Sequence, residues 1–470
     1  MTYPVVLVNV SRNTNAISFP MGLSVVANAL LHHDITPQII DLIPVMPDQR
    51  IDYFLRTMPK EPAIYGFSMM IGNFHLDHAE HYARLIKEHS PDSIVVYGGS
   101  LPSSVPELLV ENCECDFVIH GEGEVVFPAF VKALREGESF PEGPGIFYKG
   151  ADGQVVGTKA KRMRRLDHLS RQNYSLFDMD FYSGYFKEVG LSWEIMASRG
   201  CKAHCSFCYK FMGDGIGLRE VGEVLDEIQY IMENYGITKF YFVDENFMQI
   251  KKYFYSFLEE KKNRGLNFTF IASSRIDEID EERISIAKEH GLTALTTGVE
   301  SVNQATLNAI DKRIDIEDAE RAVKLLRQYG IRPHVNLIIG FEWESEDDYK
   351  AMLEFIERND LRGTVKLSYL TPLPATRLYE DAKSRNKLGK PEFEYVRTLG
   401  NLYWELMVNM TNMPDELLKH YYALISDVGK ETRALPVTPA YRQNLNDDLV
   451  MYKTVAAPSP PPAHAAWSLP

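Results

Sequence analysis

The feature that most constrains this chain is an alternation of strand-like and helix-like segments that recurs twice along its 470 residues. In the first series, strand-like apolar runs occupy residues 5–10, 38–42, 63–69, 94–97 and 117–119. Helical spacing of apolar residues appears between them, at residues 23–31, 78–89 and 106–112. Buried strands that alternate with helices are typical of βαβ units. Residues 1–150 therefore predict an α/β fold with a doubly wound, Rossmann-like parallel sheet.

The second series predicts a different arrangement of the same units. Its strand-like runs occupy residues 193–197, 239–243, 267–272, 294–299, 334–339 and 364–369. Helix patterns lie between them at residues 221–235, 251–262, 281–290, 316–329 and 346–358. Six β/α units favour a partial (β/α)6 barrel of the TIM type, in which the active site lies at the C-terminal ends of the strands.

The remaining stretches set the expected domain boundaries. Residues 151–188 show no steady period and are interpreted as a linker ahead of a barrel at 189–385. A helical C-terminal region is expected at 386–455, with helix patterns at 395–408 and 414–425. Residues 456–470 are rich in proline and alanine and predict a disordered tail.

Charge and apolar content exclude some partners. The net charge of −15 disfavours nucleic acid, because no basic excess is available to neutralise phosphates. One basic run, at residues 159–165, is interpreted as a solvated linker. No apolar run is long enough to predict a membrane span, and the first residues carry neither a basic region nor a cleavage site of a signal peptide. Five cysteines without a disulfide framework indicate a reducing compartment, so a cytoplasmic protein is expected.

Three of the five cysteines form a C-x3-C-x2-C motif directly after the first strand of the second series: Cys201, Cys205 and Cys208. Thiolates are soft ligands that suit zinc or iron–sulfur clusters. A structural zinc ion needs four ligands, and His204 is poorly placed to be the fourth, because it adjoins Cys205. Cys113 and Cys115 fall in the first series and are interpreted as small buried hydrophobic residues. The motif therefore predicts a [4Fe–4S] cluster with one iron free of protein ligands.

Turns rich in glycine and hydroxyl groups follow three strands of the first series. They contain Ser68 with Gly72-Asn73, Gly98-Gly99-Ser100, and Gly121-Glu122-Gly123-Glu124. Glycine lets the backbone approach a bulky ligand closely, and the ends of parallel strands meet at one edge of a sheet. Each turn alone is better explained as an ordinary strand-to-helix connection. Together they favour a ligand-binding edge.

The cysteine motif resembles the signature of the radical S-adenosylmethionine (SAM) enzymes, as Cys201-Lys-Ala-His-Cys205-Ser-Phe207-Cys208. Three further segments resemble motifs of that family: residues 243–247, 298–301 and 371–376, the last with Ala375 in place of glycine. The resemblance implies that the open iron binds SAM and that SAM is cleaved to a 5′-deoxyadenosyl radical. Its implied SAM contacts are Phe207, Tyr209, Arg275, Glu300 and Ser301. Each has a competing interpretation. Phe207 and Tyr209 are also consistent with ordinary packing, Arg275 with a surface arginine, and Glu300 with a solvated turn carboxylate.

Residues 1–150 resemble the cobalamin-binding domain that precedes the barrel in class B radical SAM enzymes. The matching segments are Pro20-Met-Gly22-Leu23, Ser68 with Gly72-Asn73, Tyr97-Gly98-Gly99 and His120-Gly121-Glu122-Gly123-Glu124. The implied cobalamin contacts are Gly22, Ser68, Gly72, Asn73, Gly98, Gly99, Gly121, Glu122 and Gly123. The chain has no Asp-x-His-x-x-Gly segment. That segment supplies a histidine to cobalt in cobalamin mutases and methionine synthase. The resemblance therefore implies cobalamin bound without a histidine from that motif, with a lower axial position that is empty or filled by water or by a side chain that the sequence does not identify.

The resemblance implies a methyltransferase that acts on an unactivated carbon of a small molecule or natural-product intermediate. A donor such as flavodoxin or ferredoxin would supply the electron. Two alternatives remain: a cyclase or rearrangement enzyme with the same cofactors, and a non-catalytic cofactor sensor, against which the intact cysteine motif argues. Residues 340–345 depart from the family's Gly-x-Pro-Gly-Glu-Thr, which leaves the shape of that loop open. No catalytic side chain and no substrate can be identified.

Overall fold

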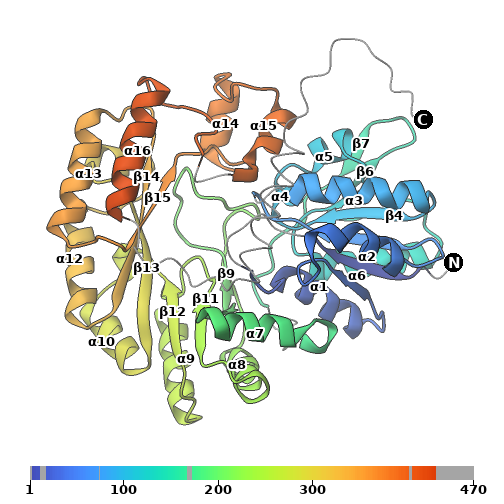
Figure 1. Cartoon of the computed structure of the whole chain (residues 1–470), viewed down its shortest axis with the longest axis horizontal. Coiled ribbons are helices and arrows are strands. Elements are labelled where there is room, and N and C mark those ends of the chain that lie inside the picture. The colour runs from blue at the N-terminus through green and yellow to red at the C-terminus, as the bar shows by residue number, and fades with distance from the viewer. Residues whose placement is uncertain (1–2, 11–16, 73–74, 167–171, 402–404, 430–470) are drawn as a thin grey trace.

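The computed structural model describes the whole chain except residues 1–2, 11–16, 73–74, 167–171, 402–404 and 430–470. Two sheets lie side by side, each flanked by helices (Figure 1). The predicted proline- and alanine-rich tail lies outside the described residues. Among the described helices, none has the length and apolar character needed to cross a bilayer.

The N-terminal sheet has the strand order β2-β1-β3-β4-β5-β6-β7. Its parallel strands are β1 (Val5–Asn9), β2 (Gln38–Asp41), β3 (Ile64–Ser68), β4 (Ile94–Gly98) and β5 (Phe117–Ile119). This order, 2-1-3-4-5, is that of flavodoxin-like doubly wound sheets. An antiparallel hairpin of β6 (Ile146–Lys149) and β7 (Val155–Gly157) extends the sheet beyond β5. The prediction of an α/β sheet is confirmed, with a mixed edge that alternation of strands and helices does not reveal.

Helices flank this sheet: α1 (Met21–His32), α2 (Arg50–Thr57), α3 (His75–His89), α4 (Ser100–Ser104), α5 (Pro106–Asn112) and α6 (Gly123–Arg135), with a 3-10 turn η1 (Pro47–Gln49). The predicted helices at 23–31, 78–89 and 106–112 correspond to α1, α3 and α5. Proline at the first position of α5 fits a helix start, where its missing N–H costs nothing.

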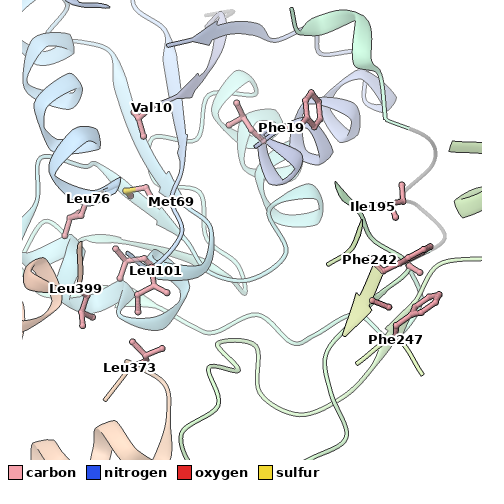
Figure 2. Close-up of a cluster of buried hydrophobic side chains, with 14 of the residues drawn as sticks. Val10, Phe19, Met69, Leu76, Leu101, Ile195, Phe242, Phe247, Leu373 and Leu399 are labelled. Carbon is pink, nitrogen blue, oxygen red and sulfur yellow. The ribbon is translucent and has the colours of Figure 1, made fainter. Parts of the chain in front are cut away.

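Residues 151–188, which the sequence predicts to be a linker, contain regular structure. A 3-10 turn, η2 (Tyr174–Leu176), leads into helix α7 (Met179–Val189), which Asp178 caps by accepting from the amide of Phe181. The ring of Tyr182 lies 5.4 Å from that of Phe19, and the ring of Phe186 lies 4.9 Å from that of Trp193. Phe19 is among the buried residues in Figure 2. Helix α7 therefore packs against both halves of the chain.

The second sheet is fully parallel, with the order β15-β14-β13-β12-β11-β8. Its strands are β8 (Trp193–Ile195), β11 (Lys239–Phe242), β12 (Thr269–Ser273), β13 (Leu292–Glu300), β14 (Arg332–Ile339) and β15 (Val365–Tyr369). Between them run α8 (Val221–Tyr235), α9 (Lys251–Asn263), η3 (Ile276–Glu278), α10 (Glu281–Glu289), α11 (Gln304–Ala309), α12 (Ile316–Gln328) and α13 (Glu346–Arg358). These helices cover the outer face (Figure 1). The sequence predicted this open, six-stranded partial barrel.

The C-terminal region contains α14 (Arg377–Ser384), α15 (Glu392–Thr398), η4 (Leu399–Asn401) and α16 (Asp415–Gly429). The helix expected over residues 395–408 ends early, because α15 stops at Thr398 and residues 405–408 are not helical. Leu399 and Leu373 belong to the same hydrophobic cluster as Leu76 and Leu101 of the N-terminal half (Figure 2). The C-terminal region therefore helps to join the two sheets.

Candidate cofactor sites

The cysteine loop is a closed hairpin at the C-terminal end of β8. Strand β9 (Ser198–Arg199) pairs antiparallel with β10 (Gly217–Leu218), so the loop leaves and returns at one place. Gly200 has a φ of +94°, and a Cβ there would lie 2.1 Å from the carbonyl oxygen of Gly215. Only glycine fits where these two backbones approach so closely.

The turn after β11 holds the first half of this hairpin. The carboxylate of Glu245 accepts from the amide of Gly200 at 2.9 Å. The side chain of Gln249 accepts from the amide of Lys202 at 3.0 Å and donates to the carbonyl of Gly200 at 2.8 Å. The backbone on both sides of Cys201 is therefore fixed by polar side chains from the turn after β11.

Asp244 secures the strand that leads into the hairpin. Its carboxylate accepts from the hydroxyl of Ser198 at 2.5 Å and from the amide of Ala197 at 3.0 Å. Burial raises the pKa of Asp244 to about 7, against the lowering effect of these hydrogen bonds. Residues 243–247 thus hold the backbone of the strand and hairpin that contain Ala197 and Gly200. The sequence did not predict this role.

The hairpin brings the three thiols together. Cys201 is buried and Cys205 and Cys208 are half-buried. The amide of Cys208 donates to the carbonyl of Cys205 at 3.2 Å, which makes the turn between them tight. Burial and the neighbouring thiols of Cys205 and Cys201 raise the pKa of Cys208 to about 12. A cationic metal centre favours the thiolate form of such crowded thiols, so the donor set fits an iron–sulfur cluster.

Among the described residues, no three Cys, His, Asp or Glu side chains are arranged to share one metal ion. A cubane cluster makes a different demand, because each cysteine binds its own iron atom. Cys113 and Cys115 pack, half-buried by side-chain exposure, against the core of the first sheet, where burial raises the pKa of both thiols. They lie in the turn between α5 and β5, in the N-terminal half where the sequence placed them.

Arg275 points its guanidinium at the cysteine loop. Its Nη1 lies 3.6 Å from the sulfur of Cys205, and its Nη2 donates to the carbonyl of Lys312 at 2.7 Å. The Nε of Arg275 pairs with Asp277 at 2.8 Å. With 8% of its surface exposed, Arg275 is a buried cation beside a metal-binding motif and not an ordinary surface residue.

Glu300 is buried in an ion pair at the end of β13. Its Oε1 accepts from the ammonium of Lys312 at 2.8 Å, and both side chains are less than 10% exposed. Glu300 has a φ of +71°, and the register between β13 and β14 shifts between Gly298 and Glu300. A Cβ on Gly298 would lie 1.8 Å from Oε1 of Glu300. The strand irregularity and the glycine together leave space for this carboxylate, which is not a solvated turn residue.

The loop at residues 340–345, where the sequence departs from the family motif, is ordered by Glu344. Its Oε2 accepts from the amides of Gly340 and Phe341 at 3.0 and 3.1 Å, and the hydroxyl of Ser301 lies 3.4 Å from its Oε1. The ring of Phe341 contacts that of Phe207 edge-on, with centroids 6.4 Å apart. Ser301 and Phe207 therefore both meet this loop.

The pH dependence of stability tests this arrangement. Burial raises the pKa of Glu344 from 4.5 to about 8, so the folded state favours the protonated form. Its stabilising effect is fully present below about pH 4.5 and is lost as the pH rises through about 8. We expect thermal unfolding to show that Glu344→Gln flattens the fall in Tm between pH 5 and pH 8, where ionisation costs on the order of a few kcal/mol. Equal slopes in the two proteins would contradict the assignment.

The glycine turns of the N-terminal sheet meet at one edge. Ser68 pairs with Gly98 across β3 and β4, and a Cβ on Gly22 would lie 3.5 Å from the hydroxyl of Ser68. Gly99 has a φ of +101°, and a Cβ there would lie 2.4 Å from the carbonyl of Met69. Small residues from α1, β3 and β4 therefore expose backbone at this edge, which fits the approach of a bulky planar cofactor.

The other turns continue this edge. Gly72 has a φ of +87° and Gly121 a φ of +99°. The amide of Gly121 donates to the hydroxyl of Ser103 at 2.8 Å, and Gly123 begins α6. Asn73 lies outside the described residues.

Glu122 and Tyr209 are placed where the two halves of the chain meet. Glu122 is buried, accepts from the amide of Met163 at 2.7 Å and pairs with Arg199 at 3.4 Å. The hydroxyl of Tyr209 donates to the carbonyl of Ser100 at 2.6 Å. These contacts join the turns of the first sheet to the cysteine hairpin.

A cavity of about 440 Å³ lies between α6 and residues 141–146 and 160–163. Glu122 and Met163 contribute to its wall, together with the apolar face of α6. The cysteines and Gly98 and Gly99 do not line it. The cavity therefore adjoins the predicted cofactor edge without containing it.

Sequence comparisons agree with this division of the chain. A model of the Radical SAM superfamily matches residues 195–356, and a model of the B12 binding domain matches residues 10–131. The chain belongs to the cobalamin-binding, class B radical SAM enzymes. Its cofactors are a [4Fe–4S] cluster, SAM and cobalamin.

Relatives of this radical SAM enzyme carry different reaction names. An uncharacterized methyltransferase of Pyrococcus horikoshii is 29% identical over 78% of this chain and 79% of its own. An anaerobic magnesium-protoporphyrin IX monomethyl ester cyclase of Rubrivivax gelatinosus is 29% identical over 64% of this chain, which spans 56% of the cyclase. Cytidylyl-2-hydroxyethylphosphonate methyltransferase of Streptomyces wedmorensis is 24% identical over 72% of this chain and 73% of its own.

Solved structures of class B radical SAM enzymes share the fold. The methyltransferase TsrM of Kitasatospora setae, with cobalamin and a [4Fe–4S] cluster bound, superposes with a TM-score of 0.68 at 20% identity, over 82% of this chain and 75% of its own. OxsB with aqua-cobalamin and SAM bound has a TM-score of 0.65 at 18% identity, over 97% of this chain and 67% of its own.

Several residues of this radical SAM enzyme escaped sequence reasoning. Lys312, Glu344, Glu245 and Arg199 all have buried or partly buried polar contacts within the two sites. The partners of Lys312, Glu245 and Arg199 lie in other elements, so no spacing in the sequence announces them. Glu344 binds backbone amides of its own loop, a contact that carries no sequence signature. The one available signal was the acidic motif at residues 243–247, which marks the turn that holds the hairpin.

Proposed function

We propose that this radical SAM enzyme is a cobalamin-dependent methyltransferase that acts on an unactivated carbon of a small-molecule or natural-product intermediate. The observation that carries the proposal is the direct contact between the two sites. Tyr209, next to Cys208, donates to the carbonyl of Ser100, next to Gly99. Cys208 is proposed to hold the cluster and Gly99 to hold cobalamin. Each is thus the sequence neighbour of a residue in this hydrogen bond. Methyltransferase-named relatives in Pyrococcus and Streptomyces support the same reaction.

Each cofactor has proposed ligands in this chain. Cys201, Cys205 and Cys208 would hold three irons of the cluster. When bound, the cofactors supply reductive cleavage of SAM and a transferable methyl group. Four predicted SAM contacts are available: Arg275 lies 3.6 Å from the sulfur of Cys205, the ring of Phe207 belongs to the hairpin, and Glu300 and Ser301 follow one another at the end of β13. We assign them the polar groups and adenine of SAM.

The cobalamin site would use backbone more than side chains. Gly22, Gly72, Gly98, Gly99, Gly121 and Gly123, with Ser68, would line the edge on which the corrin lies. We assign Glu122 and Tyr209 a different role, because their polar atoms are engaged between the two sheets. Asn73 stays a predicted contact.

The two halves of the chain would bind different cofactors. We propose that residues 1–150 bind cobalamin and that residues 189–385 bind the cluster and SAM, with helix α7 as a rigid connector. An electron from flavodoxin or ferredoxin stays a predicted requirement, as does a cytoplasmic setting. The five free thiols are compatible with a reducing compartment.

The rival reaction is cyclisation or rearrangement, which the cyclase name of the Rubrivivax relative favours. The two differ in the fate of SAM. Anaerobic protein loaded with cluster and reduced cobalamin should convert methyl-deuterated SAM to S-adenosylhomocysteine and transfer the label to the cobalamin fraction, measured by mass spectrometry. Formation of methionine and 5′-deoxyadenosine alone would overturn methyl transfer. Failure to consume SAM by either route would support a silent sensor.

A further inference from the structure

We propose that the two flanks of the cysteine loop link cobalamin occupancy to the stability of the iron–sulfur cluster. The proposal rests on the cofactor placement above and adds a regulation of the two sites. The flanks are Arg199, two residues before Cys201, and Tyr209, one residue after Cys208. Both reach across to the N-terminal sheet.

The first flank is a buried ion-pair cluster. The guanidinium of Arg199 pairs with Glu122 at 3.4 Å and with Glu124 at a shorter distance. The side chain of Arg199 is 21% exposed, and those of Glu122 and Glu124 are 6% and 4% exposed. The two carboxylates flank Gly123, and Glu122 directly follows Gly121. Leaving buried charges unpaired is strongly unfavourable. A displacement of this turn is therefore expected to displace the strand that enters the cysteine loop as well.

The second flank is a hydrogen-bonded hydroxyl. The Tyr209 hydroxyl lies 2.6 Å from the Ser104 hydroxyl and donates to the carbonyl of Ser100, also at 2.6 Å. Ser100 and Ser104 are the first and last residues of α4, which begins directly after Gly99. The end of the cysteine loop is therefore attached to the turn after β4, while its start is attached to the turn after β5.

A third segment closes the arrangement through its backbone: the basic run at residues 159–165, in which Lys159, Lys161, Arg164 and Arg165 are exposed as the sequence interpretation expected. The amide of Met163 donates to Glu122 at 2.7 Å. Leu166 donates to the carbonyl of Leu218 at 2.9 Å, and Leu218 donates to that of Arg164 at 3.3 Å. The run therefore lies along β10 and connects Glu122 to the strand that closes the cysteine hairpin.

These contacts make the sites thermodynamically dependent on each other. A cofactor that orders the turns at Gly99 and Gly121 favours the state in which both flanks are docked, and a cluster that orders the loop favours the same state. Such coupling is reciprocal: each ligand changes the affinity of the other by the same factor. We expect cobalamin to slow iron loss from the cluster, and the cluster to tighten cobalamin binding, each by about fivefold or more.

The test uses full-length protein under anaerobic conditions. Cluster-loaded protein, with and without added hydroxocobalamin, is mixed with a coloured iron chelator, and the rate of iron release is followed by absorbance. In the wild type, hydroxocobalamin should slow release about fivefold or more. In Tyr209→Phe and Arg199→Lys, it should bind and yet protect less than about twofold.

Two matched variants serve as controls. Tyr329→Phe removes a hydroxyl that donates to Glu281 on the outer surface, and Arg264→Lys changes an arginine that pairs with Asp226. Both should keep the full protection. The proposal is overturned if wild-type iron release ignores hydroxocobalamin, or if both flank variants keep the wild-type protection.

A second measurement guards against variants that lose their cluster early. In the wild type alone, hydroxocobalamin affinity is compared between apo and cluster-loaded protein by absorbance titration. Equal affinities would overturn the proposal, and a tightening of about fivefold or more in the cluster-loaded protein supports it. Protein that shows the coupling but forms no S-adenosylhomocysteine would refute the methyltransferase function and leave the coupling intact.

Discussion

Cys201→Ala should abolish incorporation of the iron–sulfur cluster and, with it, reductive cleavage of SAM. Each of the three cysteines would hold one iron, so loss of one leaves two irons without a protein ligand. Cys201 is the most buried of the three thiols, and Glu245 and Gln249 fix the backbone around it. No neighbouring cysteine can replace it. Iron and sulfide analysis, visible absorbance and 5′-deoxyadenosine formation after anaerobic reconstitution measure the loss.

Cys113→Ala is the matched control. It removes a thiol of the first sheet that packs against apolar core residues, so iron content and SAM cleavage should match the wild type. The cluster assignment would be wrong if Cys201→Ala kept its iron and its SAM cleavage. A parallel loss in Cys113→Ala would show instead that any removed thiol unfolds the protein.

Lys312→Met should be the most destabilising change at the candidate SAM site. It leaves the Glu300 carboxylate buried without its cation, 2.8 Å from where the ammonium was. Breaking one partner of a buried pair costs about 3–5 kcal/mol. Thermal unfolding of the cofactor-free protein should show a Tm lower by several degrees. The double variant Glu300→Gln with Lys312→Met should recover most of the loss, because no buried charge remains.

The neighbouring Arg313 provides the control for this prediction. It pairs with Asp311 at 2.7 Å, but its side chain is 71% exposed. Exposed pairs contribute about 0–1 kcal/mol, so Arg313→Met should leave the Tm almost unchanged. If Lys312→Met lowered the Tm no more than Arg313→Met, the pair would not be the buried element described above.

The sequence predicted central strands of the first sheet, such as β1 and β3, well because both of their faces are buried and read as continuous apolar runs. Strands of the second sheet, such as β14, instead alternate buried positions with less buried ones. Helix α13 was predicted with its observed bounds, since Ser345 and Asp348 form a capping box at its start. Helix α7 was missed although its buried residues Met179, Tyr182, Phe186 and Val189 follow helical spacing, because the helix is short and its buried face is largely aromatic.

The candidate sites were likewise predicted only in part. The cysteine spacing predicted the hairpin because the ligands adjoin one another in sequence, although their role as iron ligands stays a prediction. Arg199 and Lys312 could not be predicted, because an ion pair depends on which turns the fold brings together. Arg199 is separated from Glu124 by 75 residues. The polar loop around Glu344 was flagged only as a departure from a motif, and its shape follows from two backbone amides that the sequence cannot place.

The order of these contacts along the chain has a consequence for biosynthesis. Ser100, Ser104, Glu122 and Glu124 all precede Cys201. During synthesis, N-terminal units generally fold first, so the surface that receives the cysteine loop is made before the loop leaves the ribosome. The strands that complete the second sheet, β11 to β15, come later. The newly made cysteines can therefore dock before their own sheet exists, and iron delivery belongs to a late stage of maturation, when Glu245 and Gln249 have arrived to fix the hairpin.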